Sequence, residues 1–326
     1  MKKVLSVIII CLFSLTMFTA CGGNTGITDE PIPMGTVGES PEAQTSPASA
    51  SSFGSEEDTI GTDEDPVPVE DEFDQSRVIA VFTREDGSGT RDAFVSLTGI
   101  GEDMYAEAIV ESETNQILTK VEDNEYAISY VSVGSLNPKV KALPINGVAP
   151  SDATITDGSY TLQRPFVLCV NGDNKGNKLV QDFISFILSA EGQEIVGTKW
   201  TKIDTNAPDY SPGGLSGTLK VGGSTSVEPL MQSLSEAYKA LNPGIDIEIS
   251  GGGSGTGISE ATDGVLNIGM SSRALKDTEM EALEDYNIAL DGVAVIVNPA
   301  NPITSITIDQ VKDIFTGEVT RWTDVG

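Results

Sequence analysis

The apolar positions of residues 77–326 follow two alternating periods. Short runs of apolar, often β-branched residues predict strands, at 78–82, 127–133, 166–170, 219–221, 245–249, 266–270 and 293–297. Apolar residues spaced three or four apart predict amphipathic helices, at 114–121, 179–190, 229–241 and 307–314, with further helices starting near Asp92 and Ile258 and a helix break near Gly192. Strands that alternate with helices in this way predict α/β lobes.

Three of the predicted strands run into a turn rich in Gly, Ser and Thr, and each turn leads into a predicted helix. The turns lie at 84–91, 222–226 and 251–257. A helix start presents free backbone N–H groups and the positive end of the helix dipole, so each turn can bind an anion. Arg84 adds a planar, permanently charged guanidinium at the first turn. Together the three turns favour a small oxyanion over an ordinary structural role.

The first 76 residues predict an export signal and a tether. Lys2 and Lys3 precede an apolar run that is too short for a membrane span, which is typical of a signal peptide over residues 1–20. The sequence up to Cys21 resembles the lipobox of bacterial lipoproteins, so Cys21 is the expected lipidation site, with plain secretion as the alternative. Residues 21–76 are acidic and rich in Gly, Pro, Ser and Thr, which predicts a disordered linker or, alternatively, an interaction tail. With Cys21 acylated, Cys169 remains as a buried thiol and no disulfide forms.

Charge and composition exclude several classes of protein. The 326 residues carry a formal charge of −30 and contain no histidine. Such an acidic chain is a poor ligand for nucleic acid or an anionic membrane surface. Without histidine there is no Ser-His-Asp triad and none of the commonest zinc ligand sets, so we expect no metal and no cofactor.

The glycine-rich turns do not match nucleotide-binding motifs. Turn 251–257 is followed by Ile258, where a phosphate-binding NTPase loop requires lysine. No turn has the glycine spacing and downstream acidic residue of a dinucleotide site.

Five segments of residues 77–326 resemble the motif set of PstS-type phosphate-binding proteins, the receptors of phosphate ABC importers. They are Gly223–Leu230, Gly251–Gly257, Ile268–Arg273, Ile314–Gly317 with Trp322, and Arg84–Arg91. The resemblance implies a two-lobed, type II periplasmic-binding-protein fold that closes on phosphate. One lobe would comprise 77–164 plus 294–326 and the other 165–293. The implied ligands are Thr225, Ser226 and Ser254 from one lobe and Arg84, Ser88, Gly89 and Thr90 from the other. Asp86 would orient Arg84, the expected sole cationic ligand.

Two departures from the family pattern stand out. Asn267 occupies a motif position that is commonly Asp in the family. That Asp accepts the proton of a protonated phosphate. Because an amide can also donate, this substitution weakens the chemical reason for rejecting sulfate, although a neutral replacement with phosphate still bound is the preferred interpretation.

The second departure is the order of the motifs. In the family the half containing Ser224 and Arg273 comes first, whereas here the Arg84 half comes first. Joining Gly326 to Ser76 would restore the family order, and the old termini would be fused through 198–217. The chain is therefore interpreted as a circular permutant, with a truncated tandem or misassembled reading frame as the alternative.

The predicted function is a monomeric, non-enzymatic phosphate receptor, lipid-anchored on the outer face of the cell membrane, that delivers phosphate to an ABC permease. One alternative is a receptor for sulfate or another tetrahedral oxyanion. A second is a secreted phosphoesterase with Ser224 or Ser88 as nucleophile, for which no general base is evident. A third is a surface adhesin that retains the fold.

Overall fold

The computed structural model describes residues 72–325. The predicted signal peptide, the lipidation site at Cys21 and nearly all of the predicted linker lie outside these residues.

The described strands form one hydrogen-bonded series in the order β2-β1-β3-β9-β5-β8-β6-β7, with β4 paired to β9. The strands are β1 Ala80–Arg84, β2 Ile109–Glu111, β3 Ala127–Ser132, β4 Lys141–Ala142, β5 Gln163–Asn171, β6 Gly217–Gly223, β7 Ile245–Gly251, β8 Ile268–Ser271 and β9 Leu283–Val297. The helices are α1 Gly89–Thr98, α2 Thr114–Glu122, α3 Asp152–Thr156, α4 Gly172–Lys175, α5 Lys178–Ile187, α6 Ala190–Val196, α7 Glu228–Leu241, α8 Ser254–Thr262, α9 Asp277–Met280 and α10 Ile308–Thr316. Two 3-10 turns lie at Val133–Ser135 and Trp322–Asp324.

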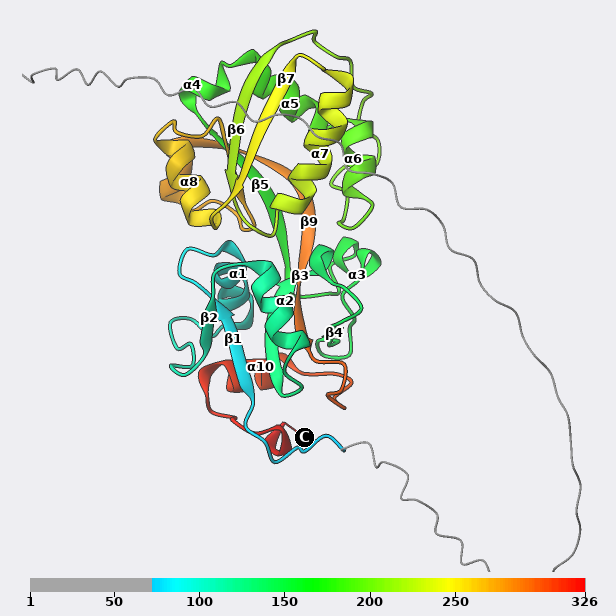
Figure 1. The fold of residues 1–326 in the computed structure, drawn as a ribbon, viewed down its shortest axis with the longest axis vertical. Coiled ribbons are helices and arrows are strands. Elements are labelled where there is room, and N and C mark those ends of the chain that lie inside the picture. The colour runs from blue at the N-terminus through cyan, green and yellow to red at the C-terminus, as the bar shows by residue number, and fades with distance from the viewer. Residues whose placement is uncertain (1–71, 326) are drawn as a thin grey trace, which may run out of the picture. The chain divides into compact units, whose positions relative to one another are not determined.

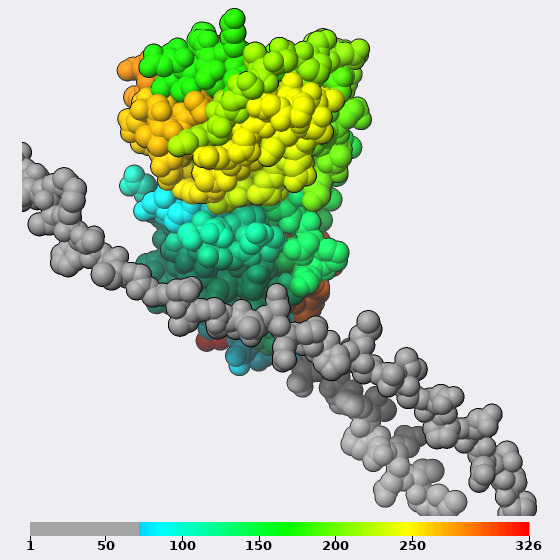
Figure 2. Space-filling model, turned by 45° about the horizontal axis from the view of Figure 1, so that its top comes forward, coloured from blue at the N-terminus to red at the C-terminus, as the bar shows by residue number. Residues whose placement is uncertain are grey.

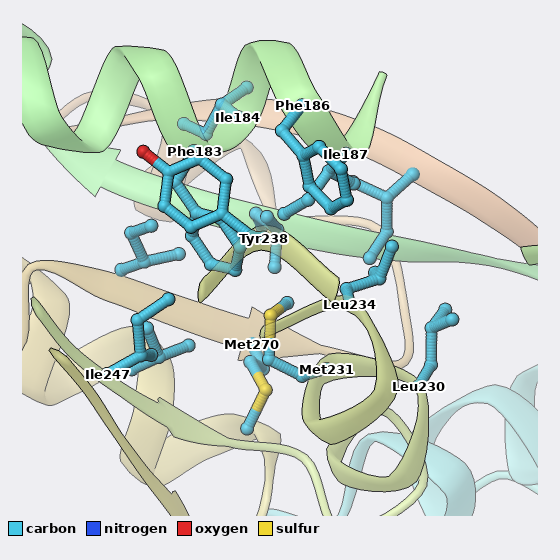
Figure 3. Close-up of a cluster of buried hydrophobic side chains, with 14 of the residues drawn as sticks. Phe183, Ile184, Phe186, Ile187, Leu230, Met231, Leu234, Tyr238, Ile247 and Met270 are labelled. Carbon is cyan, nitrogen blue, oxygen red and sulfur yellow. The ribbon is translucent and has the colours of Figure 1, made fainter. Parts of the chain in front are cut away.

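Two hydrophobic cores define two lobes. In the lobe that carries Ser224, the apolar faces of α5 and α7 meet over the sheet, and Phe183 and Phe186 lie against Tyr238 (Figure 3). We call this the Ser224 lobe. In the other, the Arg84 lobe, Phe94 of α1 stacks on Tyr130 of β3 with ring centroids 3.9 Å apart. Burying each such side chain contributes about 1.5–3 kcal/mol, so each lobe has the means to hold its own shape.

Strands β5 and β9 run from one lobe into the other as an antiparallel pair (Figure 1). Their register shifts between Phe166 and Val167, which marks an irregularity at the crossing. Just beside it, Arg164 and Asp291 form a buried ion pair with an Nη2–Oδ2 distance of 3.0 Å. The two lobes are therefore joined by paired strands that can bend where the ladder is irregular.

Three expected elements differ in the structure. The strand expected at 293–297 begins at Leu283, because residues 283–292 pair with β5 although many of them are half-exposed and polar. Helix α1 begins at Gly89 rather than near Asp92, so the Gly-Thr segment forms its first turn. The helix break lies at Leu188–Ser189, where Ser189 caps α6, and Gly192 sits inside that helix.

The segment 75–79 lies beside the segment 320–325. The amide of Thr323 donates to the carbonyl of Gln75 at 2.8 Å, and that of Ile79 donates to Thr320 at 2.8 Å. Phe73 packs between Tyr126 and Trp322, so the fold starts a few residues earlier than the predicted linker boundary at 76. Both segments belong to the Arg84 lobe.

Candidate functional site

Three helix starts converge on the boundary between the lobes. Helix α1 starts at Gly89 with Ser88 as its cap, and α8 starts at Ser254. Helix α7 follows the turn of Ser224 to Val227, in which the Ser224 hydroxyl accepts hydrogen bonds from the amides of Ser226 and Val227 at 3.2 and 3.4 Å. Since each start presents N–H groups and a partial positive charge, the boundary can bind an anion without many cations.

The lobes contact each other through these turns. The hydroxyls of Thr90 and Ser226 lie 2.8 Å apart, and the amide of Gly255 donates to the carbonyl of Gly87 at 2.9 Å. Gly89 fits so closely that an added Cβ would lie 2.2 Å from the hydroxyl oxygen of Ser254. In Figure 2 the yellow surface of the Ser224 lobe abuts the cyan and teal surface of the Arg84 lobe. The predicted Ser88, Gly89, Thr90, Thr225, Ser226 and Ser254 are thus brought together.

Arg84 is 2% exposed and is held at the same boundary. Its Nη2 donates to the Thr225 hydroxyl at 3.1 Å, which links the two lobes, and to the carbonyl of Ser112 at 2.9 Å. The Arg84 guanidinium donates to both carboxylate oxygens of Glu85, from Nε to Oε2 at 2.9 Å and from Nη2 to Oε1 at 3.0 Å. A buried, charge-assisted fork of this kind fixes the orientation of the arginine.

Asp86 does not hold Arg84, contrary to the prediction. Its side chain is 94% exposed and pairs with Arg91 instead. The sequence offered two adjacent carboxylates, and the backbone direction after β1 turns Glu85 toward Arg84 and Asp86 toward solvent.

Asn267 also lies elsewhere than predicted. It precedes β8, where its side-chain oxygen accepts the amide of Lys220 at 2.8 Å and its amide donates to Asn174 at 2.9 Å. Strand β8 leads away from it toward the boundary, and five extended residues span roughly 16 Å. Asn267 therefore bonds within the sheet, at the end of β8 that lies away from the boundary.

Ser272, at the other end of β8, occupies the boundary instead. Its amide donates to the Ser254 hydroxyl at 3.1 Å, and the two hydroxyl oxygens lie 3.3 Å apart. Ser272 is fully buried, and a Cβ on Gly89 would lie 2.9 Å from its hydroxyl. The motif 268–273 contained this residue, but only its position at the strand end indicates its role.

Tyr130 and Arg273 bond to residues of the site, Tyr130 to Arg84 and Arg273 to Asp92 of α1. The Tyr130 hydroxyl accepts the amide of Arg84 at 3.3 Å, and burial raises the pKa of Tyr130 to about 12, so it stays a neutral hydroxyl. Arg273 of the Ser224 lobe donates from Nε to Asp92 of α1 at 2.9 Å, which is a second charged link between the lobes. Arg273 also donates to both carboxylate oxygens of Glu279, and this lowers the pKa of Glu279.

A groove with a volume of about 470 Å³ opens at the boundary between the lobes, and its lining includes Thr225 and Glu85, two residues that contact Arg84. Glu85, Glu113 and Glu228 line it together with several hydroxyl and amide groups. The groove reaches Thr225 and Glu85, both of which contact Arg84, so it offers a path from solvent to the guanidinium.

The hydroxyls of the serines considered as nucleophiles accept backbone amides, Ser88 as the cap of α1 and Ser224 within the turn before α7. Ser88 accepts the amide of Arg91 at 3.4 Å, and Ser224 accepts two amides. Among residues 72–325 no carboxylate is hydrogen-bonded to either hydroxyl. In the same residues no cluster of His, Cys, Asp and Glu could hold a metal ion, and no helix is long and apolar enough to cross a membrane.

Comparison with known proteins places the chain in a family. A model described as the PBP superfamily domain matches residues 71–191 and 209–326. Phosphate-binding protein PstS 2 of Streptococcus pneumoniae is 42% identical over 256 residues, which cover 76% of this chain and 87% of that protein. The chain belongs to the PstS-type phosphate-binding protein family.

Two further relatives agree with this PstS-type assignment. PstS 2 of Streptococcus agalactiae is 41% identical over 257 residues, covering 76% of this chain and 87% of that protein. A crystal structure of a phosphate-binding protein of a phosphate ABC transporter from S. pneumoniae is 41% identical, with a TM-score of 0.64, and covers 77% of this chain and all of that chain. The type II periplasmic-binding-protein fold predicted from the sequence is confirmed.

Proposed function

We propose that this protein is a non-enzymatic receptor that captures inorganic phosphate between its lobes and delivers it to an ABC permease. The observation that carries the proposal is the meeting of three helix starts and Arg84 at one buried boundary, with Thr90 and Ser226 in contact across it. Buried donors act at low effective dielectric, so they can outweigh the repulsion from a chain of charge −30. The relatives named as phosphate-binding proteins support the choice of phosphate.

The proposed ligands are Arg84, Ser88, Gly89, Thr90, Thr225, Ser226, Ser254 and, in place of Asn267, Ser272. Titration calorimetry of the purified protein with phosphate tests the proposal. Saturable 1:1 binding is expected, and its absence contradicts the proposal. Turnover of a chromogenic phosphate ester that is lost in Ser224→Ala would favour the phosphoesterase instead.

A receptor for sulfate is the second candidate. The observation that favours it is the hydroxyl group of Ser272, which can donate as well as accept a hydrogen bond. Among residues 72–325 no carboxylate is hydrogen-bonded to Ser226, Ser254 or Ser272, whose hydroxyls can either donate or accept. Such hydroxyls satisfy a protonated phosphate and an unprotonated sulfate alike. Parallel titrations decide: preference for phosphate by less than tenfold supports a general oxyanion receptor.

We propose that the chain is circularly permuted relative to the motif order of other PstS-type proteins, an arrangement that it shares with the PstS 2 relatives, whose match runs over 256 residues. The adjacency of 75–79 and 320–325 supports this, because a short link there could restore the family order. The family match is also interrupted at 192–208, which overlaps the segment 198–217 that would join the original termini. A variant opened within 203–214 and joined from Gly326 to Ser76 is expected to fold and bind phosphate with unchanged affinity. Failure to fold would contradict the permutation.

We further propose that the receptor is extracytoplasmic, monomeric and anchored through Cys21. Cys21 lies in the lipobox-like sequence, and a receptor for an importer must meet its ligand outside the membrane. Metabolic labelling with palmitate tests the anchor, and Cys21→Ser is expected to abolish labelling and release the protein from the membrane fraction. Light scattering of the released protein tests the monomer.

A further inference from the structure

A second cavity, with a volume of about 340 Å³, lies between the lobes and is lined in part by α1. Its walls come from residues 92–97 of α1, residues 163–165 of β5 and residues 273–276, and it shares no lining residue with the groove beside Arg84. The volume falls in the range of sites that bind small molecules. The cavity therefore requires a separate explanation from the phosphate site.

The lining combines cations with an apolar surface. Arg164, Arg273 and Lys276 are the cationic lining residues, and Arg164 is already paired with Asp291 and Arg273 with Asp92 and Glu279. Asp92 is engaged by Arg273, whereas Lys276 is exposed and forms no ion pair within the described part of the chain. The apolar walls are Ala93, Leu97, Pro165 and Ala274. An exposed ammonium without an ion-pair partner beside apolar walls favours an anionic ligand with a hydrocarbon body.

Arg164 contributes an unpartnered buried donor. It is 3% exposed, and its Nε and Nη2 both donate to Asp291, at 3.1 and 3.0 Å. Its Nη1 has no hydrogen-bond partner among residues 72–325. Because an unpaired buried N–H is unfavourable, an oxygen supplied by a ligand would be stabilised there.

The strand register places this guanidinium on the side of the cavity. Ser132 donates to Asp291 at 2.8 Å, and Ser132 shares a face of β3 with Tyr130, two residues earlier. Phe94 of α1 stacks on Tyr130 from that face. The Arg164–Asp291 pair therefore lies on the face that α1 covers, where the cavity is found.

We propose that this cavity binds a small organic monocarboxylate, with its carboxylate directed to Arg164 and Lys276 and its hydrocarbon against Leu97 and Pro165. Because Arg273 and Lys276 belong to the Ser224 lobe and α1 to the Arg84 lobe, the bound carboxylate bridges the two lobes. It thereby stabilises the closed arrangement that also forms the phosphate site at the start of α1. By linkage, such a ligand tightens phosphate binding. This coupling rests on the proposed function, whereas binding of the carboxylate does not.

Butyrate is a suitable probe, and butylamine is its matched control of opposite charge. We expect calorimetry on the intact protein to give a dissociation constant of about 1 mM for butyrate, the value typical of so few ligand atoms, and no binding of butylamine. Ser96 is an exposed residue of α1 that lines the cavity, so Ser96→Trp would fill the cavity and is expected to abolish butyrate binding. Ser259→Trp, at an exposed position of α8 outside the cavity, is expected to leave it unchanged.

Lys276→Gln provides a milder test that keeps the cavity open, and we expect it to weaken butyrate binding about fivefold. The proposal is overturned if butyrate does not bind, if butylamine binds equally, or if Ser96→Trp binds butyrate like the parent protein. Phosphate titrations without butyrate and with butyrate at about 20 times its dissociation constant test the coupling. At least a threefold gain in phosphate affinity is expected. Phosphate titration without butyrate reports separately on the proposed function.

Discussion

The hydroxyls of Thr90 and Ser226 lie 2.8 Å apart although 136 residues separate them along the chain. One belongs to the first turn of α1 and the other to the turn before α7, so the contact joins the two lobes at the proposed phosphate site. The contact brings the two hydroxyls close enough to serve one ligand.

We predict that Gly89→Ala weakens phosphate binding about 100-fold while leaving the unfolding temperature nearly unchanged. The added methyl would lie 2.2 Å from the Ser254 hydroxyl and 2.9 Å from that of Ser272, so it opposes closure without disturbing either core. Calorimetry and thermal unfolding measure the two effects. Gly172→Ala, where an added Cβ meets nothing within 4 Å, is the matched control and is expected to bind normally.

Arg84→Ala is predicted to abolish phosphate binding while the fold is retained. A hydrogen bond to a charged group contributes about 1.5–3 kcal/mol, and a guanidinium at a buried boundary can supply more than one such bond. Arg77→Ala removes an exposed arginine of the same lobe and serves as the charge-matched control. Equal losses in both variants would mean that net charge, rather than the position of Arg84, governs affinity.

Glu85→Gln is predicted to tighten phosphate binding several-fold. The change removes a negative charge beside the anion, while the carbonyls of Glu111 and Ser112 still hold the guanidinium, at 3.2 and 2.9 Å. Asp86→Asn makes the same chemical change one residue later, on a side chain that is 94% exposed, and is expected to leave affinity unchanged. A larger effect from Asp86→Asn than from Glu85→Gln would contradict the assignment of Glu85.

Glu279 is predicted to stabilise the fold in a pH-dependent way. Hydrogen bonds from Arg273 lower the pKa of Glu279 from its ordinary value of 4.5, so its stabilisation is complete above that value and is lost as the pH falls below it. The unfolding midpoint of Glu279→Gln should lie below that of the parent at pH 6, and the difference should shrink toward pH 3. The exposed Glu281, changed to Gln, is the control and should show no such trend.

Local signals were sufficient to predict most of the residues that the structure brings together at the proposed site. Ser88, Thr225 and Ser254 lie in strand–turn–helix segments whose chemistry is contained in a few consecutive residues. Asn267 was misassigned because its role depends on which end of β8 faces the other lobe, and that is set by pairing with β5 and β6. The length of β9 was missed for a similar reason: residues 283–292 look like a polar loop until β5, more than a hundred residues earlier, pairs with them.

The two lobes differ in how much of the chain each needs. The core of the Ser224 lobe draws only on residues 166–289, whereas the core of the Arg84 lobe contains both Ile79 and Val325. As the exported chain emerges amino-terminus first, the first of these cores can therefore assemble before the last residues arrive, but the second is complete only once Val325 has emerged. Until then, the apolar strands that follow Ile79 have no complete core to pack into, so the half of the protein that emerges first is the half that folds last.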